Sequence, residues 1–246
     1  NEIYFTAGGS ESDNWALKAT AEAYEKKGKH IITTKIEHHA ILHTCEYLEK
    51  QRGFEITYLD VDENGVVKLD ELKKAIRPDT ILISVMFANN EIGTIQPIRE
   101  IGEIAQEHKI LFHTDAVQAF GQIPIDVDAC HIDMLSASGH KLNGPKGIGF
   151  YISARSQDPI LCTRRCTGEK APCRNRKRAW YCWNGGSCER AMRTMETRTA
   201  KERKLRDYLI ERIETEIPYC RLNGDRTNRL PNNVTSVSGL SRENLF

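Results

Sequence analysis

The sequence predicts an α/β fold in which a mostly parallel β-sheet is sandwiched between helices. Short β-rich apolar runs alternate with helical patterns from residue 1 to about residue 152, which is typical of βαβ units. The run at residues 81–87 is almost continuously apolar, as expected of a strand that helices cover on both faces. With 246 residues, the chain is long enough for one large domain and part of a second.

The first elements of this fold can be placed in order. Residues 3–5 form a strand at the very start, so we expect the chain to begin inside a domain whose upstream part is missing. A helix should follow Ser10 and stop at Gly28. Its inward face is predicted from residues at intervals of four: Trp15, Ala19 and Ala23.

A strand at residues 30–36 precedes the second helix, and residues 54–59 form another strand before a turn at 62–65. The apolar spacing of the second helix predicts its inward residues: Ile41, Cys45 and Leu48. Because the strand at 81–87 is apolar throughout, we place it in the centre of the sheet.

The later elements repeat the alternation. Pro97 opens a helix, because its fixed φ suits the first turn. The inward residues of that helix are Ile98, Ile101, Ile104 and Ala105. Further strands are expected at 110–112, 134–137 and 148–152. A long charged pattern at 189–217 predicts a helix that leads into a second domain.

Composition excludes some classes of partner. Lys and Arg number 35 against 34 Asp and Glu, so the balance of charge favours neither nucleic acid nor an anionic membrane as the main partner. No run approaches the roughly 18 apolar residues that a membrane span needs, and the first ten residues lack the regions of a signal peptide. We therefore expect a cytoplasmic protein.

Polar residues follow the predicted strands at five points. These strand ends are residues 6–10, 37–38, 89–91, 115 with 118, and 138–141. In a doubly wound sheet, ligands bind beyond the carboxyl ends of the strands. A flat, aromatic, phosphorylated and electron-withdrawing cofactor would use every one of these ends.

A phosphate group would suit the first strand end. Gly8, Gly9 and Ser10 precede a helix, so backbone N–H groups and the positive helix end can cradle an anion while Ser10 adds a hydroxyl. A Gly-Gly-Ser helix start taken alone is more often a simple tight turn.

Asp115 lies at the end of a buried strand, where an unpaired carboxylate is costly. A protonated pyridine nitrogen would pair with it and would make the ring an electron sink. The alternative interpretation is a helix N-cap, since Asp is favoured at that position.

Lys141 follows a buried strand, and the glycines and proline of residues 140–147 fix a rigid turn beside it. Partial desolvation there would lower its pKa and free the amine for imine formation and proton transfer. Lys146 is expected to serve structure or solvent contact instead.

Three further side chains are candidates for the ring. His38 could lie flat on it or shuttle a proton, although a lone histidine is more often structural, and the adjacent His39 is expected on a helix surface. Asn90 and Gln118 are candidate donors to a phenolic oxygen, with ordinary loop capping as the alternative.

Five motifs together resemble the NifS/IscS cysteine desulfurases. They are Phe-Thr-Ala-Gly-Gly-Ser-Glu-Ser at 5–12, Glu-His-His-Ala at 37–40, Ala-Asn-Asn-Glu-Ile-Gly-Thr-Ile-Gln at 88–96, His-Thr-Asp-Ala-Val-Gln at 113–118 and Ser-Gly-His-Lys-Leu-Asn-Gly-Pro-Lys-Gly at 138–147. The resemblance covers residues 1–152 and resumes from about 188 to 233.

The resemblance implies a fold-type I enzyme, dimeric in the family, that uses pyridoxal 5'-phosphate. Lys141 would hold this cofactor as a Schiff base, Asp115 would pair with the ring nitrogen and His38 would stack on the ring. The implied contacts to the phosphate are Gly9, Ser10, Ser138 and His140. Asn90 and Gln118 would address the ring oxygen, and no metal site is predicted.

The implied reaction converts L-cysteine to L-alanine and leaves the sulfur on an enzyme cysteine as a persulfide, which iron–sulfur scaffold proteins accept. In the family, the nucleophilic cysteine and the arginine that binds the substrate carboxylate lie beyond the position of Phe246. Cys45 is expected in a helix core and Cys130 in a loop. Full activity from this chain alone is therefore not expected.

The domain division follows from the same resemblance. Residues 1–187 would form the large pyridoxal-phosphate-binding domain, and residues 188–246 would begin a smaller, truncated C-terminal α+β domain. Between 162 and 188 the family pattern gives way to Cys, Trp and Arg, which indicates a reading-frame error, and the tail at 234–240 suggests a second one. Zinc binding by these cysteines is the rival interpretation, but paired Cys-x-x-Cys knuckles are missing.

Two alternatives to a cysteine desulfurase stay open at this point. The cofactor motifs do not fix the leaving group, so a selenocysteine lyase or another class-V aminotransferase relative would carry them as well. A non-enzymatic fragment that only pairs with a desulfurase or a scaffold protein would also fit.

Overall fold

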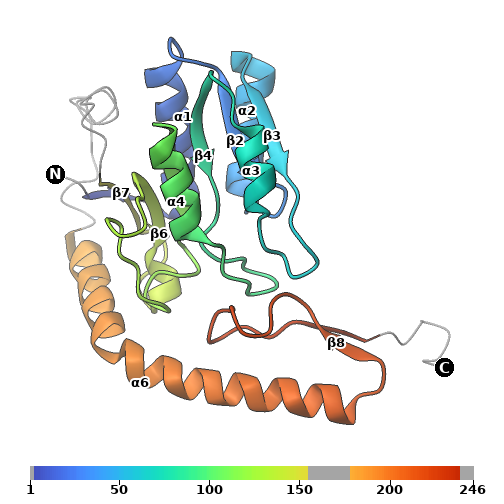
Figure 1. Ribbon diagram of the computed structural model, residues 1–246. Helices are drawn as coiled ribbons and strands as arrows, with labels where there is room; N and C mark the ends of the chain where they lie inside the picture. The colour runs from blue at the N-terminus through green and yellow to red at the C-terminus, as the bar shows by residue number, and fades with distance from the viewer. Residues whose placement is uncertain (1–2, 155–177, 239–246) are drawn as a thin grey trace.

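A seven-stranded sheet organises the computed structural model, which describes residues 3–154 and 178–238 (Figure 1). The strands are β1 Ile3–Thr6, β2 His30–Thr34, β3 Glu55–Leu59, β4 Thr80–Ser84, β5 Leu111–Asp115, β6 Met134–Ser138 and β7 Gly149–Ser153. Their order is β1-β7-β6-β5-β4-β2-β3. Neighbours from β3 to β6 pair in parallel, whereas β7 runs antiparallel to both β6 and β1. The predicted mostly parallel sheet is confirmed.

Helices cover both faces of the sheet, and a small second sheet follows them in the chain (Figure 1). The helical elements are α1 Gly9–Tyr24, α2 His39–Arg52, α3 Leu69–Ala75, α4 Ile98–Glu107, the short 3-10 helix η1 Gly139–Leu142 and α6 Arg178–Glu216. Strands β8 Cys220–Leu222 and β9 Ser236–Ser238 pair antiparallel beyond α6.

Two hydrophobic layers form the core, one on each side of the sheet. Residues of α1 and α2, such as Leu17 and Ile41, pack with one face. Residues of α3 and α4, such as Leu72 and Ile101, pack with the other. Since both faces of β2 and β4 are covered, every residue of these two strands is buried.

Most of the predicted elements are present. In α2 the inward residues Ile41, Cys45 and Leu48 are buried, and in α4 the predicted residues Ile98, Ile101, Ile104 and Ala105 are buried as well. The strand that begins at Thr80 lies next to the central strand β5 rather than at the centre itself. Helix α3 was not predicted, because its seven residues are too short to show a full apolar period.

The predicted inward face of α1 is wrong. Trp15, Ala19 and Ala23 are only partly buried, whereas the buried face mixes polar with apolar residues. It is formed by Gly9, Ser12, Asp13, Ala16, Leu17, Thr20 and Ala21. The sheet below this helix offers polar partners, such as the Met134 sulfur, which accepts the Thr20 hydroxyl at 3.5 Å. The apolar spacing of Trp15, Ala19 and Ala23 therefore predicted the wrong face of α1, next to the one that is buried.

The C-terminal part differs from prediction in its helix. We expected a helix at 189–217, and α6 begins earlier, at Arg178. A frame error is predicted for the segment at 162–188, and residues 162–177 of that segment lie outside the described residues. The proposed boundary between residues 187 and 188 falls inside α6, and the tail predicted to depart from the family is described only up to Ser238.

Gly149 provides a test of how tightly the sheet is assembled. A Cβ at this position would lie 2.6 Å from the backbone carbon of Gly8 and 2.7 Å from the oxygen of Ala137. Backbone cannot yield as a flexible side chain does, so Gly149→Ala should lower the free energy of unfolding by about 1–3 kcal/mol in urea denaturation. Gly185→Ala is the matched control, because a Cβ at Gly185 meets nothing within 4 Å in α6. That variant should gain about 0.5–1 kcal/mol, and equal losses in both variants would contradict the tight packing at Gly149.

Candidate active site

A cavity of about 230 Å³ lies at the carboxyl ends of the strands. It brings together all of the predicted site residues, which are Gly9, Ser10, His38, Asn90, Asp115, Gln118, Ser138, His140 and Lys141. They come from the strand ends that follow β1, β2, β4, β5 and β6, as expected of a doubly wound sheet. Asp13, Met86 and Val117 also line the cavity and were not predicted.

Gly9 and Ser10 open helix α1 at one side of the cavity. A Cβ on Gly9 would lie 2.5 Å from Cγ2 of Val117, so only glycine leaves room at this point. The first turn of a helix presents N–H groups that lack intrahelical partners, and these suit an anion. Ser138 lies beside Gly9, since a Cβ on Gly9 would be 3.7 Å from the Ser138 Cβ, and its hydroxyl is 2.7 Å from Nδ1 of His140. Burial and the nearby Lys141 lower the pKa of His140, which favours a neutral imidazole.

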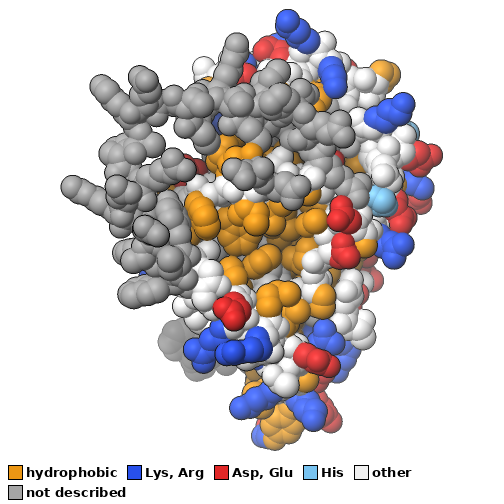
Figure 2. Space-filling view, turned by 90° about the vertical axis from the view of Figure 1, so that its left-hand side faces the viewer, with side chains coloured by type: hydrophobic (Ala, Val, Ile, Leu, Met, Phe, Trp, Pro, Cys, Tyr) orange, Lys and Arg blue, Asp and Glu red, His pale blue; other side chains and the backbone are white. Residues whose placement is uncertain are grey.

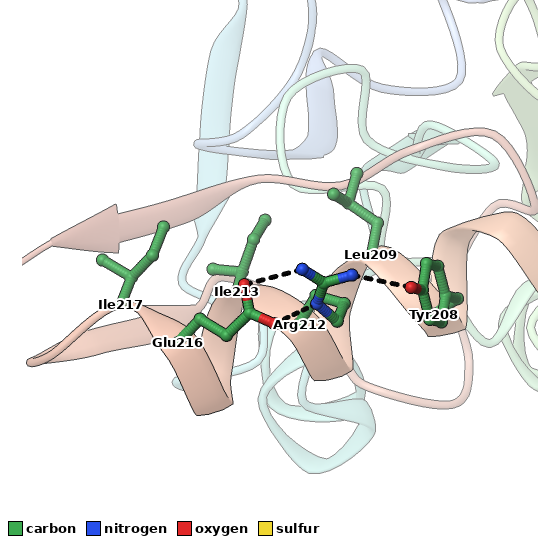
Figure 3. A pocket seen from close by; sticks show the side chains of 6 residues that line it. All are labelled: Tyr208, Leu209, Arg212, Ile213, Glu216 and Ile217. Carbon is green, nitrogen blue, oxygen red and sulfur yellow. Dashed lines mark hydrogen bonds and ion pairs between the residues drawn. The ribbon is translucent and has the colours of Figure 1, made fainter.

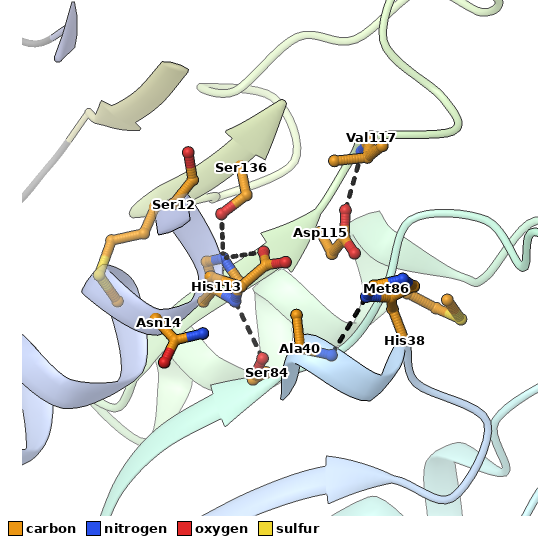
Figure 4. Close-up of polar contacts among 12 residues, drawn as sticks. Ser12, Asn14, His38, Ala40, Ser84, Met86, His113, Asp115, Val117 and Ser136 are labelled. Atoms are coloured by element: carbon orange, nitrogen blue, oxygen red, sulfur yellow. Dashed lines mark hydrogen bonds and ion pairs between the residues drawn. The ribbon is translucent and has the colours of Figure 1, made fainter. Parts of the chain in front are cut away.

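Asp115 ends β5 and is only 7% exposed. Its Oδ1 accepts the backbone N–H of Val117 at 2.9 Å (Figure 4). Burial raises the pKa of the carboxyl, while this N–H and the nearby His38 and Lys141 act in the opposite direction. A cation brought into the cavity would therefore meet a carboxyl that has no close ion-pair partner within residues 3–154 and 178–238.

His38 precedes α2 and serves as its N-cap. Its Nδ1 accepts the backbone N–H of Ala40 at 3.1 Å, which fixes the position of the ring (Figure 4). The side chain is exposed toward the cavity side, and His39 and His43 continue as a stacked pair on the surface of α2. The prediction of His39 as a helix-surface residue is confirmed.

Lys141 lies in η1 and lines the same cavity as Asp115. Its side chain is exposed, so the partial desolvation that the rigid turn predicted is not present. The turn itself is there, since Asn143 takes a left-handed conformation with φ of 57° and the backbone N–H of Gly144 bonds the oxygen of Gly139. The lysine sits at the rim, where solvent reaches it. Lys146 is exposed, which agrees with solvent contact, one of the two roles expected for it.

A polar network that the sequence did not reveal lies beneath the cavity (Figure 4). His113 is fully buried and points to the same face of β5 as Asp115, two residues further on. Its Nδ1 is 2.9 Å from the Ser84 hydroxyl on β4, and its Nε2 is 3.0 Å from the Ser136 hydroxyl on β6. Burial lowers the pKa of His113 to about 3, so the imidazole is neutral. The sequence signal for this network was that His113 and Asp115 lie two residues apart in one strand, which places them on the same face.

Two more buried carboxyls border this network. Asp13 is 1% exposed, and its Oδ1 lies 3.9 Å from Nε2 of His113 without a hydrogen bond among the described residues. Burial and the charge of Asp115 raise the pKa of Asp13, and burial raises the pKa of Glu37 to about 8. Oε1 of Glu37 accepts from the Thr34 hydroxyl and from the backbone N–H of Met86, both at 2.8 Å.

The raised pKa of Glu37 predicts how stability depends on pH. Between pH 6.5 and 8 the folded chain keeps a proton on Glu37 that the unfolded chain has released, so stability falls as the pH rises. His113 acts in the opposite direction only below about pH 6.5, where the unfolded imidazole gains a proton. Glu37→Gln should remove a fall on the order of 1 kcal/mol between urea unfolding at pH 6.5 and at pH 8. The exposed Glu63→Gln is the control, and identical slopes in all three proteins would refute the assignment.

A second hollow, of about 330 Å³, lies on the C-terminal half of α6 (Figure 3). There Arg212 donates to the Tyr208 hydroxyl at 2.7 Å and to Oε2 of Glu216 at 2.8 Å. None of the residues predicted for chemistry lines it. Within residues 3–154 and 178–238, no cluster of side chains could hold a metal ion, and no helix is long and apolar enough to cross a bilayer. Most of the cysteines considered as zinc ligands lie outside these residues or have undescribed side chains.

Comparison with known proteins decides the family. Residues 1–162 match the family described as Aminotransferase class-V. The chain belongs to this family. The chain is also similar to enzymes named cysteine desulfurase IscS: one from Clostridium botulinum is 53% identical over 252 residues, covering 100% of this chain and 63% of the relative. Another, from Methanosarcina thermophila, is 56% identical over 242 residues, covering 95% of this chain and 58% of the relative.

Solved structures agree with the class-V assignment. The structure of a NifS-like protein is 34% identical, with a TM-score of 0.83, and covers 96% of this chain and 64% of its own. A structure of SspA in complex with cysteine is 48% identical, with a TM-score of 0.62, and covers 65% of this chain and 46% of its own. The chain thus spans less than two thirds of the length of the two IscS enzymes and of the two solved structures.

Pyridoxal phosphate, on which class-V aminotransferases depend, fits the residues of the cavity. The buried Asp115 carboxyl is the group that a protonated ring nitrogen requires, and Lys141 supplies an amine to the same cavity. The space that Gly9 leaves beside the start of α1 suits a phosphate.

Proposed function

We propose that this chain is the cofactor-binding part of a pyridoxal-phosphate-dependent cysteine desulfurase. The observation that carries the proposal is the convergence of five strand ends on one cavity, with the Asp115 carboxyl and the Lys141 amine both lining it. In this proposal residues 1–187 form the large domain, and residues 188–246 begin a smaller C-terminal domain.

Different residues of the cavity bind different parts of the cofactor in this proposal. Lys141 holds the cofactor, and the phosphate is bound at the start of α1 and beside η1. The phosphate contacts are Gly9, Ser10, Ser138 and His140. Amide N–H groups of Asn90 and Gln118 donate to the ring oxygen. His38, fixed by its N-cap bond to Ala40, lies against the ring.

The chemistry relies on moving one proton and on an electron sink. Pyridoxal phosphate, when bound, withdraws electrons from the α-carbon of an amino acid. Asp115 keeps the ring nitrogen protonated, and its burial in a dry strand end strengthens that pairing. Nζ of Lys141, at the rim of the cavity, removes and returns the proton at the α-carbon. Sulfur passes from L-cysteine to the thiolate of an enzyme cysteine, which yields L-alanine and a persulfide. Among the described residues, no cysteine lines the cavity.

Substrate and partners follow from the same proposal. The 48% identical SspA structure is a complex with cysteine, which supports L-cysteine as the substrate here. Hydrophobic side chains gather on the face drawn in Figure 2, as expected of a subunit interface, and this supports a homodimer. An iron–sulfur scaffold protein is the proposed sulfur acceptor, and the cytoplasm is the proposed location.

A titration and a product assay test the proposal. Adding pyridoxal phosphate to the purified chain should produce an absorbance band of bound cofactor. L-cysteine should then change that band and, with the full-length protein, give alanine and sulfide under a reductant. Absence of any bound-cofactor band would refute the proposal and favour a chain that only binds partners. A strong preference for selenocysteine, with selenide as product, would indicate a selenocysteine lyase instead.

A further inference from the structure

Two segments far apart in the sequence bind each other beside the cavity. The first, here called the cavity loop, is residues 89–94 after β4, and it carries Asn90. The second, here called the clamp segment, is residues 223–235 between β8 and β9. A bridge joins Thr94 to Arg229, and the backbone N–H of Ile95, just after the loop, bonds the oxygen of Asn228 at 3.1 Å.

The clamp segment bonds four consecutive carbonyls of the cavity loop. Nδ2 of Asn233 donates to the oxygens of Asn90 at 3.3 Å and Glu91 at 3.2 Å, and the Thr235 hydroxyl also donates to Glu91. The remaining donors are Nη2 of Arg229 to Ile92 at 2.9 Å and the backbone N–H of Leu230 to Gly93 at 2.8 Å. A loop with all of these oxygens occupied has little freedom to move.

Arg229 lies at the centre of this contact and is only 2% exposed. Its guanidinium forms no ion pair within the described residues and donates instead to oxygens of both segments. Besides Ile92 these are the backbone oxygens of Asn233 at 3.2 Å, Asn223 at 3.3 Å and Asp225 at 3.1 Å, and Oδ1 of Asn233 at 3.3 Å. A buried charge without such acceptors in place would be strongly destabilising. The rigid fork of arginine therefore holds the two segments at one fixed distance.

Close packing adds a steric component to these bonds. A Cβ on Gly93, where φ is +78°, would lie 2.5 Å from Oδ1 of Asn233. A Cβ on Gly224, also with φ of +78°, would lie 2.6 Å from Oγ1 of Thr94. Since each segment has a glycine where the other approaches, their fit is close from both sides.

The side chain of Asn90 depends on this contact for its position. It lines the cavity, yet it forms no hydrogen bond with any described residue, and only its backbone oxygen is bonded. On the other side of the loop, Oδ1 of Asn89 accepts the N–H groups of Glu91 at 2.8 Å and Ile92 at 3.0 Å. The amide of Asn90 is thus placed by its backbone alone.

We propose that Arg229 and Asn233 are positioning residues that hold the Asn90 amide in the cavity by fixing the backbone of the cavity loop. The meaning of this placement rests on the proposed function, in which Asn90 addresses the bound cofactor. The structural part of the inference does not depend on any cofactor.

Amide hydrogen exchange of the cofactor-free chain tests the structural part. Asn233→Ala and Arg229→Lys should each accelerate exchange at least 10-fold in peptides that cover residues 89–95, with β5 and α4 unchanged. Arg226→Lys is the matched control, because Arg226 is exposed in the same segment and pairs with Glu214 at 2.6 Å instead of the loop. Wild-type exchange in both variants would overturn the inference. Acceleration spread over the whole core would overturn it as well, since the two residues would then give only general support.

Cofactor affinity tests the consequence for Asn90. Asn233→Ala should raise the Kd for pyridoxal phosphate about as much as Asn90→Ala does, roughly 10-fold for one lost hydrogen bond. Combining the two changes should cause no further loss, because an unpositioned amide has nothing left to contribute. Fully additive losses would overturn the coupling. If the wild-type chain itself fails to bind the cofactor, the proposed function fails, while hydrogen exchange still decides whether the clamp segment fixes the loop.

Discussion

Lys141→Ala should abolish the absorbance band of bound pyridoxal phosphate and reduce turnover of L-cysteine by at least about 1,000-fold, equivalent to roughly 4 kcal/mol. The reason is that Nζ of Lys141 is proposed both to attach the cofactor and to move the proton at the α-carbon, so one change removes two functions. The band is read from an absorbance spectrum after dialysis, and turnover from alanine formation by the full-length protein.

The matched control for this experiment is Lys146→Ala. Lys146 lies five positions after Lys141 in the same turn. It is exposed and does not line the cavity. Its replacement should leave both the band and the turnover within about twofold of the wild type, since exposed side chains rarely contribute more than about 0.5 kcal/mol. A band that persists in Lys141→Ala but disappears in Lys146→Ala would move the attachment point to the second lysine.

Asp115→Asn should weaken cofactor binding and turnover by roughly 100- to 1,000-fold, because breaking a buried ion pair costs about 3–5 kcal/mol. An asparagine keeps the shape and still accepts the N–H of Val117, but it cannot balance a positive ring nitrogen. Cofactor binding is measured by absorbance titration, and Asp60→Asn is the control because Asp60 is exposed and pairs with Lys35 on the surface.

The same variant should affect stability in the opposite direction. Burial raises the pKa of Asp115, so the ionised carboxyl destabilises the folded cofactor-free chain, and stability falls as the pH rises toward that raised pKa. Asn carries no charge, so cofactor-free Asp115→Asn should unfold at an equal or higher urea concentration than wild type at pH 8. A loss of both stability and cofactor binding would indicate simple misfolding and would contradict the assigned role.

The position of the site could be predicted because it depends on topology. Once alternating strands and helices indicate a parallel sheet, the residues after each strand must meet at one edge, and Asn90, Asp115 and Lys141 do so. Which residues end each strand can be predicted from the sequence around that strand alone. The roles of these residues in binding remain predictions.

What escaped prediction depends on contacts that periodicity cannot express. Asp13 lies on a helix face whose buried residues mix polar with apolar side chains, so the apolar pattern predicted burial on the face of Trp15 instead. Arg229 resembles an ordinary surface arginine in a polar turn, and only the fold brings it to the carbonyl of Ile92. The exposure of Lys141 likewise depends on which residues pack around the rim of the cavity, and the sequence pattern does not give these contacts.

The antiparallel pairing of β1 with β7 has a consequence for synthesis on the ribosome. Among the described residues, the strand that leads into Gly9 and Ser10 pairs only with β7, which does not begin until Gly149. A nascent chain that has emerged only as far as β6 has no template on which to order its first strand. The strand before Gly9 and Ser10 can therefore pair only after the residues around Gly149 have left the exit tunnel, and under the proposed function loading with the vitamin-derived coenzyme would follow that step.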